Sequence, residues 1–458
     1  MSDPVLDTAA RLAVQYLSGL GERPVGATAT IDELRARLGG GLPEEGIPAQ
    51  IVLEDLAASA DAGLVASAGG RFFGFVLGGS IPAALGADWL AGAWDQNAGL
   101  YISAPAAAVC EEVAGEWLRQ LFGLPEGVSV AFVTGGQMAN FTCLAAARHA
   151  LYRRAGWDVE VDGIAGAPPL RIIASRQRHV TIDRALRFLG LGTSHIEVVD
   201  ADDQGRMRVE SLRECLDARP GDTPLLVCAQ VGNVNSGAFD AIDRIADVLE
   251  GGSAWLHVDG AFGLWAAACP SLRRLTTGLE RADSWAVDTH KWLNVPYDSG
   301  LAFVADPASH RAAMSVHADY LQQAEQGAAR DGVDWHPEFS RRARGFAVYA
   351  ALRALGRSGL VDMIERTCAL ARHAAERIRA SGEAEVLNEV VLNQVLVRFG
   401  PPDERTNETI RAAQSDGTCW VGGTLWQGRP SMRISVSNWR TTQDDIEASV
   451  DAILRASR

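Results

Sequence analysis

The chain has 458 residues, and at about 150 residues per domain this length predicts two or three structural units. Apolar residues make up 47% of it, but no run nears the ~20 apolar residues of a membrane-spanning helix, and the first residues lack a signal-peptide pattern. The formal charge of −15 comes without a cluster of cations, which disfavours nucleic acid and anionic membranes as partners.

The first sixty residues are predicted to form an N-terminal helical arm (1–65). Its helices are expected over Val5–Leu20, Ile31–Leu38 and Ala49–Ala62, and a Thr30-x-x-Glu33 capping box opens the second one. These helices are amphipathic and short for a self-standing domain, so we expect the arm to pack on a partner subunit.

A large α/β domain is predicted over residues 66–320. Its helices are expected at Pro82–Asp95, Pro105–Leu121 and Met138–Arg154, and its strands at Val128–Val133, Leu170–Ala174, His195–Val199, Leu225–Gln230, Ala254–Val258, Ser284–Val287 and Gly300–Val304. Short, continuous apolar strands that alternate with helices favour a mostly parallel sheet covered by helices on both faces.

The last part of the chain, residues 321–458, is predicted to hold a mobile loop and a small C-terminal α+β domain. The stretch Gln322–Gly332 is rich in Ala, Gln and Gly and is expected to be mobile. A long helix is predicted over Ser340–Ser358, and strands are predicted near Val390–Phe399 and Met432–Val436.

Two residue types stand out in the composition. Lys291 is the only lysine, and a lysine can lose its proton near neutral pH and act as a nucleophilic amine, which arginine cannot do. The seven cysteines are scattered and form no CxxC pair. We therefore expect free thiols in a reducing compartment, which makes a cytoplasmic enzyme the default interpretation.

Asp259 and Lys291 are both predicted to follow buried strands, at the carboxyl edge of the sheet where ligands bind in doubly wound folds. This placement would bring one carboxylate and one amine into one crevice, although a helix cap or a salt bridge would also explain Asp259. His257-x-Asp259 could suggest a metal pair, but no third ligand is evident, so we expect no metal site.

The segment Thr134–Asn140 forms a Gly-rich junction between a strand and a helix. Glycines permit a tight turn there, and the N-terminus of the helix offers free N–H groups to a phosphate. The junction matches neither the GxGxxG nor the Walker pattern, which disfavours a dinucleotide or ATP site. A phosphate-binding turn, a carboxylate, an amine and a stacking group together fit pyridoxal 5′-phosphate (PLP).

The same residues carry a resemblance to the group II PLP-dependent decarboxylases, a fold type I family that contains aromatic-amino-acid, glutamate and histidine decarboxylases. The runs His257–Gly263 and Asp288–Leu293 resemble its HVDAA and HKW blocks. Further similarity lies in the TGGxxAN turn and in the segments Arg178-His179, Gly232-Asn233, Phe239-Asp240, Ser340–Arg342 and Met432–Ser435. The resemblance covers most of the chain and implies a fold type I transferase fold, decarboxylation of an L-amino acid, and a homodimer with its active site at the subunit interface.

The resemblance also implies roles for individual residues. Lys291 would bind the aldehyde carbon of PLP, Asp259 would pair with the pyridinium nitrogen, and His179 would stack on the ring. The remaining cofactor contacts would come from Gly136, Gln137, Met138, Asn233, Ala261 and His290, with the phosphate held by backbone N–H groups of the first three. Arg433 would form either a domain-bridging ion pair or a contact with the substrate carboxylate.

Two departures from the family pattern bear on the chemistry. Aromatic-amino-acid decarboxylases carry a loop tyrosine that helps to protonate Cα, whereas this chain has Gly332 or Val333 near that place. Within the family such a change accompanies oxidative formation of an aldehyde, which keeps an aldehyde synthase as an alternative. The residue three places before Lys291 is Asp288, where some relatives have Asn, so the role of Asp288 is open.

The substrate pocket is predicted to include Phe75, Val76, Trp94 and Asn97, and its aromatic lining favours an aromatic or large apolar amino acid. Core packing would also explain these aromatic residues. The segment Asp95–Asn97 resembles a polar segment of glutamate-type decarboxylases, which keeps an acidic substrate as an alternative. The sequence also leaves open a different PLP-dependent lyase, an aminotransferase, or a binding protein that has lost its activity.

Overall fold

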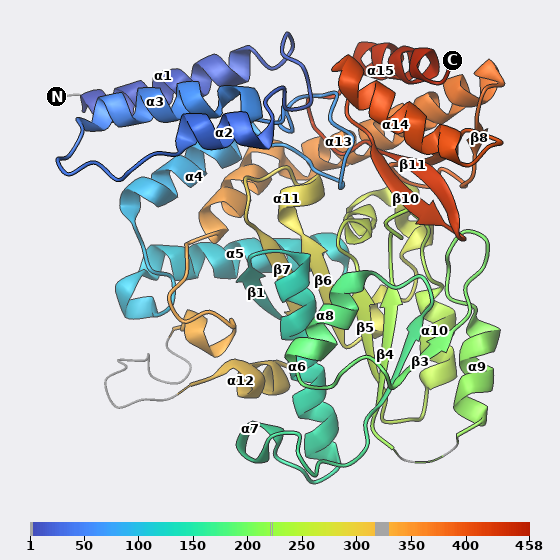
Figure 1. Cartoon of the computed structure of the whole chain (residues 1–458). Helices are drawn as coiled ribbons and strands as arrows, with labels where there is room; N and C mark the ends of the chain where they lie inside the picture. The colour runs from blue at the N-terminus through green and yellow to red at the C-terminus, as the bar shows by residue number, and fades with distance from the viewer. Residues whose placement is uncertain (1–2, 220, 222, 317–328) are drawn as a thin grey trace.

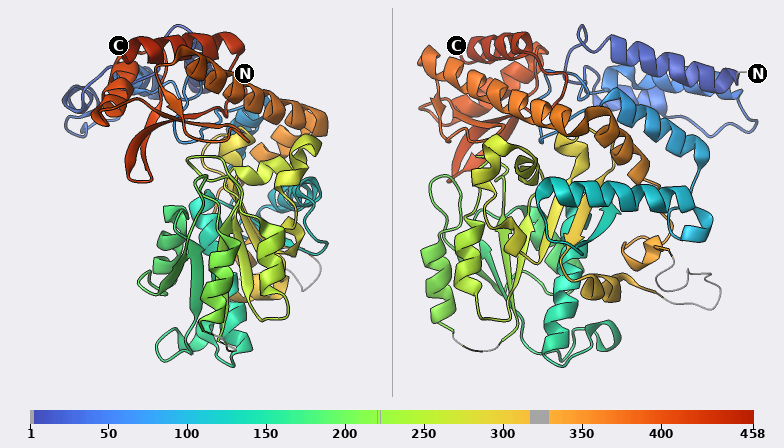
Figure 2. Two further views of the ribbon diagram at one scale, coloured as in Figure 1. Left: turned by 90° about the vertical axis from the view of Figure 1, so that its right-hand side faces the viewer. Right: turned by 180° about the vertical axis from the view of Figure 1, so that it is seen from behind.

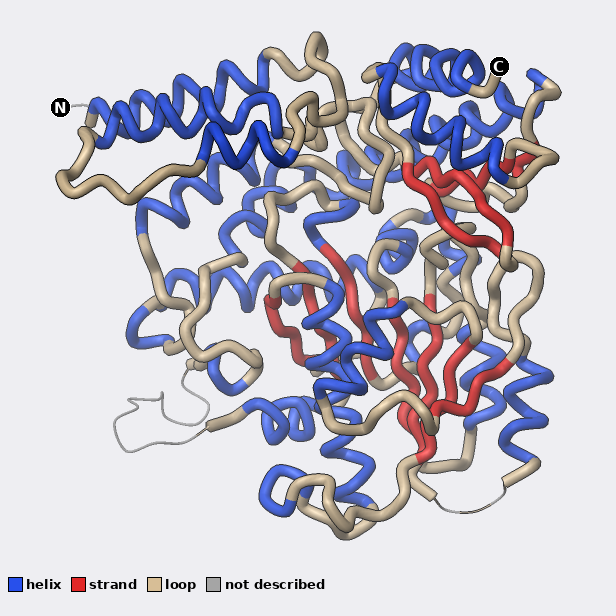
Figure 3. Tube along the Cα trace, in the orientation of Figure 1, coloured by secondary structure: helices blue, strands red, loops and turns tan. Residues whose placement is uncertain are grey.

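Two β-sheets organise the chain in the computed structural model, which describes residues 3–219, 221, 223–316 and 329–458 (Figure 1). Within these residues one sheet has seven strands and the other has four, and Figure 3 shows them as separate groups of strands. The predicted mobile stretch Gln322–Gly332 and the neighbouring Tyr320 fall largely outside the described residues, since only 329–332 are described.

The seven-stranded sheet has the order β1-β7-β6-β5-β4-β2-β3. Its strands are β1 (Ser129–Val133), β2 (Arg171–Ser175), β3 (Ile196–Val199), β4 (Leu225–Gln230), β5 (Trp255–Asp259), β6 (Ser284–Asp288) and β7 (Gly300–Val304). Neighbouring strands from β3 to β6 pair in parallel, whereas β7 pairs antiparallel with both β1 and β6. The prediction of a mostly parallel sheet is confirmed.

Helices cover both faces of this sheet, and the strands are apolar on both faces for that reason. In β2, Ile172 and Ala174 belong to a core cluster with α6 and α8, whereas Ile173 belongs to the cluster of the opposite face, with α5 and α10. The helices in this part of the chain are α4 (Pro82–Trp94), α5 (Pro105–Phe122), α6 (Gly136–Arg154), α7 (Val159–Asp162), α8 (Val180–Phe188), α9 (Val209–Asp217), α10 (Ile242–Leu249), α11 (Thr289–Trp292) and α12 (Pro307–Met314).

The four-stranded sheet lies in the C-terminal part and is antiparallel throughout, in the order β10-β11-β9-β8. Its strands are β8 (Glu385–Val386), β9 (Gln394–Arg398), β10 (Gly422–Trp426) and β11 (Arg429–Ser435), and the helices around it are α13 (Gly345–Ser381), α14 (Glu404–Asp416) and α15 (Gln443–Ala456). Short 3₁₀ helices complete the described elements: η1 (Asp61–Gly63), η2 (Tyr101–Ser103), η3 (Gly263–Ala268), η4 (Pro270–Leu275), η5 (Leu279–Arg281) and η6 (Gly332–Asp334).

Three N-terminal helices lie side by side at the same end of the molecule as the small sheet (Figure 2). They are α1 (Pro4–Ser18), α2 (Ile31–Leu38) and α3 (Ala49–Ala60). The predicted capping box opens α2, because the N–H of Glu33 donates to Thr30 Oγ1 at 3.3 Å and the N–H of Thr30 donates to Glu33 Oε2 at 2.7 Å. The prediction of this helix and its cap is confirmed.

The prediction of a long helix over Ser340–Ser358 is wrong at both ends, because α13 runs from Gly345 to Ser381. Within α13, Gly356 has non-helical dihedral angles (φ 61°). The residues directly before it are not part of a helix: Arg342 forms a β-bridge with Asn97, and the Arg341 guanidinium binds the buried Glu111 carboxylate at 2.6 and 3.0 Å. Strands β8 and β10 were not predicted, since one has two residues and the other begins with two glycines.

A buried histidine in α12, His310, which packs against β1, gives a testable pH dependence of stability. Burial, together with the nearby positive Arg330, lowers the pKa of His310 to about 3, while its ring donates to the Trp335 carbonyl at 3.0 Å. An unfolded histidine has a pKa of about 6.5, so below that pH the unfolded state takes up a proton that the folded state does not. The free energy of unfolding therefore falls as the pH drops, by about 1.4 kcal/mol per unit for this group.

We expect His310→Gln to remove this contribution, so that its free energy of unfolding declines about 2 kcal/mol less than that of the wild type between pH 6.5 and pH 5. Urea unfolding at the two pH values measures the difference. The exposed His195 provides the control, since His195→Gln should leave the wild-type decline unchanged. An equal decline in the wild type and His310→Gln would contradict the prediction.

Candidate active site

Two adjacent parallel strands deliver the central residues of the site. Strand β5 ends at Asp259, and β6 ends at Asp288, directly before the short helix α11 that carries His290 and Lys291. Because β5 and β6 are parallel neighbours, their carboxyl ends meet at one edge of the sheet. The pocket at this edge is lined by His179, Gln230, Gly232, Val234, Asp259, Ala261, Phe262 and Lys291.

Asp259 is buried, and its carboxylate is held in place from two sides. Its Oδ2 accepts a hydrogen bond from Asn140 Nδ2 at 3.2 Å, and its Oδ1 accepts one from the N–H of Ala261 at 3.2 Å. Asn140 Oδ1 lies 2.9 Å from His257 Nε2, and His257 Nδ1 lies 2.9 Å from Ser284 Oγ. Both ring nitrogens of His257 are thus used inside the protein, and burial lowers its pKa to about 4, which keeps the ring neutral.

His179 is linked to Asp259 through the same asparagine. Asn140 Nδ2 also donates to Thr181 Oγ1 at 3.0 Å, and this hydroxyl lies 2.8 Å from His179 Nδ1. Burial lowers the pKa of His179, with opposing effects from Asp259 and Lys291, so the imidazole is neutral near pH 7. Asn140 therefore positions both the carboxylate and the imidazole of the pocket.

We expect Asn140→Ala to lower the free energy of unfolding by about 1–3 kcal/mol, because two buried atoms, His257 Nε2 and Asp259 Oδ2, lose the hydrogen-bond partner that Asn140 provides. Urea unfolding measures this loss. Thr181→Val is the matched control, since it removes only the hydroxyl that links Asn140 to His179. It should lower the free energy of unfolding by less than Asn140→Ala does. A loss for Asn140→Ala no larger than that for Thr181→Val would contradict the role of Asn140.

A close turn between β1 and α6 packs against Asp288 and His290. Gly135 has φ 154°, and a Cβ there would lie 2.8 Å from His290 Cε1, while a Cβ at Gly136 would lie 2.8 Å from Asp288 Oδ2. Only glycines allow this approach, which brings the first N–H groups of α6 against the Asp288–His290 segment. The N–H of Gly136 donates to Asp288 Oδ1, and Asp288 Oδ2 lies 2.8 Å from Lys291 Nζ.

The sequence matches the family model of the pyridoxal-dependent decarboxylase conserved domain over residues 32–399. The chain belongs to the pyridoxal-dependent decarboxylase family. Its cofactor is therefore PLP, and it is an amino acid decarboxylase, a carboxy-lyase. The resemblance inferred from the motifs is confirmed.

Similar proteins include an aromatic-L-amino-acid decarboxylase of Bacillus atrophaeus, which is 27% identical over 95% of this chain and 91% of its own length. An acidic amino acid decarboxylase of Mus musculus is 32% identical over 74% of this chain and 62% of its own length. Among solved structures, that of Oryza sativa TDC with PLP and tryptamine superposes with a TM-score of 0.92 at 25% identity, and it covers 100% of this chain and 99% of its own. The predicted fold type I architecture is confirmed.

The decarboxylase pocket fits PLP. Beside the Gly135–Gly136 turn, the first turn of α6 can offer the backbone N–H groups of Gln137 and Met138 to a phosphate, while the N–H of Gly136 donates to Asp288. The buried Asp259 can pair with a pyridinium nitrogen, and Lys291 supplies the amine.

Not every predicted residue lines this pocket. The Asn233 side chain holds its own turn, since its Oδ1 accepts from the N–H of Asn235 at 2.9 Å and its Nδ2 donates to the Gln177 carbonyl at 3.3 Å. Its neighbours Gly232 and Val234 line the pocket instead.

The predicted substrate residues also lie apart from the pocket within this chain. The exposed Phe75 ring lies 5.2 Å from the Trp420 ring, and the half-exposed Trp94 ring lies 5.0 Å from that of Phe346. Val76 is buried in the main core, and Asn97 Oδ1 accepts from the N–H groups of residues 99 and 341.

Sequence reasoning missed Gln230, Phe262 and the positioning residue Asn140. Gln230 is the last residue of β4, so the rule that points to the carboxyl ends of strands could have found it. Asn140 lies inside the recognised TGGxxAN turn, but its partners are 41 and 119 residues away in the sequence. No local pattern reveals such contacts.

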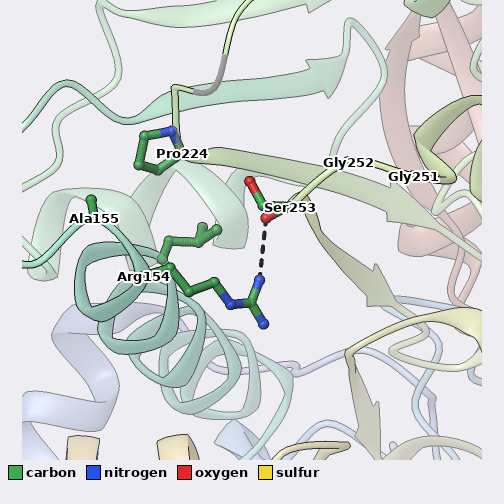
Figure 4. Close-up of a pocket in the computed structure, with 7 residues that line it drawn as sticks. Arg154, Ala155, Pro224, Gly251, Gly252 and Ser253 are labelled. Carbon is green, nitrogen blue, oxygen red and sulfur yellow. Dashed lines mark hydrogen bonds between the residues drawn. The ribbon is translucent and has the colours of Figure 1, made fainter.

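A roomier cavity of about 450 Å³ opens at the opposite, amino-terminal edge of the sheet (Figure 4). Its charged lining residue is Arg154, which donates to the Ser253 carbonyl at 3.2 Å. Pro224, Gly251 and Gly252 supply much of the remaining wall. Because its described lining residues include no carboxylate, histidine or lysine that could activate the Ser253 hydroxyl or act on a substrate, we place the chemistry at the Lys291 edge.

Proposed function

We propose that the chain removes the α-carboxylate of an L-amino acid with an aromatic side chain and releases the amine and carbon dioxide. The observation that carries the reaction is the convergence of Lys291, Asp259 and His179 on one pocket. The aromatic substrate rests on the similarity to the Bacillus atrophaeus enzyme across 95% of this chain. An acidic amino acid is the alternative, since an acidic amino acid decarboxylase is 32% identical over a shorter stretch.

PLP, when bound, supplies an aldehyde that bonds to amines and a ring that accepts the electron pair released from the Cα–carboxylate bond. In the mechanism that we propose, the Lys291 amine holds the cofactor aldehyde between turnovers. Asp259 keeps a proton on the ring nitrogen, because its buried carboxylate is fixed by Asn140 and the N–H of Ala261. His179 would orient the reacting carboxylate, and His179 and Ala261, which both line the pocket, would hold the cofactor ring.

We assign the binding of the substrate carboxylate to Arg433. This side chain is buried, and its Nη1 donates to the carbonyl of the lining residue Val234 at 2.8 Å. Its Nε is buried without a hydrogen-bond partner among the described residues. Burial also lowers the pKa of Arg433, as expected for a cation that lacks a carboxylate partner.

The test is product analysis after incubation of the PLP-loaded enzyme with a panel of L-amino acids, in air and without oxygen. Amine and carbon dioxide in both atmospheres, from an aromatic substrate, would support the proposal. Turnover of aspartate, glutamate or cysteine sulfinate alone would select the acidic alternative. A PLP-loaded enzyme that turns over no panel member would overturn the proposal.

A second candidate function is oxidative formation of an aldehyde, favoured by the absence of tyrosine between Tyr320 and Tyr349. Val333 and His336, near the expected tyrosine position, are buried, and His336 accepts from the N–H of Phe132 at 2.8 Å. Without a proton donor, the carbanion at Cα can reduce oxygen. Amino acid, oxygen and water would then give aldehyde, carbon dioxide, ammonia and hydrogen peroxide, and peroxide formed only in air is the readout.

We further propose that the protein is a homodimer whose interface includes the N-terminal helices. Large apolar side chains are exposed on this arm, among them Leu6, Val14, Ile31, Leu38 and Leu56, each more than half exposed. Such a surface favours a second protein over water. Light scattering should give about twice the 48.8 kDa of one chain, and a monomer at micromolar concentration would contradict the proposal.

We also propose that the enzyme works in the cytoplasm and that residues 1–65, 66–320 and 321–458 act as its arm, its PLP-binding domain and its small domain. All seven cysteines are free in the structure, which suits a reducing compartment. Within the described residues, no helix has the length and apolar character needed to cross a bilayer. Cell fractionation tests the location.

A further inference from the structure

The Asp288 carboxylate occupies the position in which an anion is expected at the N-terminus of α6. It is 3% exposed and accepts the N–H of Gly136, the first residue of this 19-residue helix. Its Oδ1 also lies 3.3 Å from His290 Nε2. The same N–H group and the same imidazole are expected to contact the cofactor phosphate, so a carboxylate and a phosphate compete for one cradle.

The carboxylate is balanced by Lys291 in the unloaded chain. Burial alone would raise the pKa of Asp288, but the adjacent Lys291 and His290 and the N–H of Gly136 bring it below its usual value. Burial lowers the pKa of His290, and it raises that of Tyr297, whose ring stacks on His290 at 4.2 Å. The charged and titratable groups that act on this site from the surrounding elements are Lys291, His290, Tyr297, Asp298, Asp259, His179 and Arg433.

Loading of the cofactor removes this balance. The Lys291 nitrogen, once bonded to the aldehyde carbon, is no longer the free ammonium group that faces Asp288 Oδ2. A phosphate has a second pKa of about 6 and is a dianion at pH 8. Asp288 is the last residue of the buried strand β6, and the Trp265 Nε1–H donates to its main-chain carbonyl at 3.0 Å, which limits how far its carboxylate can withdraw.

We propose that Asp288 holds the phosphate cradle in the unloaded chain and takes up one proton from solvent when the phosphate enters. Its carboxyl group then donates an O–H to a phosphate oxygen, and the N–H of Gly136 becomes free for the phosphate. No electrons move in this step: one O–H bond forms on Asp288, and water supplies the proton. The binding of the cofactor, independently of the substrate or the reaction, is thereby coupled to pH.

The test uses the full chain freed of its cofactor and, as the probe, pyridoxal 5′-phosphate, whose aldehyde bonds to Lys291 in both of the proteins that are compared. Isothermal titration at pH 8 in two buffers that differ in ionisation enthalpy counts the protons taken up on binding. We expect about one proton more for the wild type than for Asp288→Asn, whose amide already carries a donor. We also expect the variant to bind the probe about tenfold more tightly at this pH.

Equal proton uptake by the two proteins would overturn the proposal, because it would mean that an ionised Asp288 withdraws from the cradle. Weaker binding of the probe by Asp288→Asn would also overturn it. If the variant does not fold, the wild type alone tests the proposal. The Kd of the wild type for the probe should rise about tenfold per pH unit between pH 7 and 8.5, as the uptake of one proton on binding requires. A Kd that does not change with pH would refute the coupling.

Discussion

Lys291→Ala is expected to reduce decarboxylation on the order of 10³-fold or more, the largest effect of any single substitution that we predict. Lys291 is the only amine-bearing side chain of the protein, and it lines the pocket between Asp259 and Asp288. Its loss removes the group that bonds to the cofactor aldehyde. Steady-state assays with saturating PLP measure the loss.

Lys291→Arg is the matched control, since it keeps the positive charge beside Asp288 but cannot form the covalent bond. It should be as inactive as Lys291→Ala. Reduction of the PLP-loaded wild type with borohydride, followed by mass spectrometry, should place the label on Lys291. Activity of Lys291→Arg within tenfold of the wild type would contradict the assigned role.

Asp259→Asn is expected to lower kcat by about 10²–10³-fold, because an amide cannot stabilise the charge of a protonated ring nitrogen as a carboxylate does. The substitution is nearly isosteric, but an amide has a single acceptor oxygen, which can serve Asn140 Nδ2 or the N–H of Ala261 but not both. Stability should therefore fall by about 1–3 kcal/mol, and kcat of the protein that remains folded should still fall by the factor given above. Stopped-flow and steady-state kinetics of the PLP-loaded protein measure the effect.

Asp283→Asn is the control for this substitution. Asp283 is also a largely buried carboxylate on the large sheet, where it accepts from the N–H of Leu256 at 2.7 Å, but it lies at the amino end of β6. Its replacement should leave kcat within a few-fold of the wild type. Similar losses of kcat in both variants would mean that the effect of Asp259→Asn comes from a disturbed sheet.

The strands and the two central residues could be predicted because they depend on local patterns. Strands β4 and β7 were predicted with their observed bounds, since each is a short apolar run buried on both faces. Asp259 and Lys291 follow such runs, so the rule for the carboxyl ends of parallel strands was enough to place them together. The capping box of α2 is equally local.

Long-range contacts decided the features that could not be predicted. Residues 340–344 were predicted as the start of a helix, but Arg341 pairs with Glu111, 230 residues earlier, and Arg342 forms a β-bridge with Asn97, so the helix begins only at Gly345. The positioning role of Asn140 likewise depends on His257 and Asp259, more than a hundred residues away. The predicted substrate residues Phe75 and Trp94 lie in motifs that are local in the sequence. Their observed neighbours, Trp420 and Phe346, come from distant parts of the chain.

The position of the solitary lysine in α11, directly before a buried tryptophan, has a practical consequence for following the folding of this protein. A protease that cleaves only after lysine has one site in the entire chain, at the Lys291–Trp292 bond. Trp292 is completely buried, and its Nε1 donates to Thr367 Oγ1 at 3.0 Å, so the folded chain cannot present this bond. Cleavage into two fragments would therefore report the opening of the active-site core, without any added label.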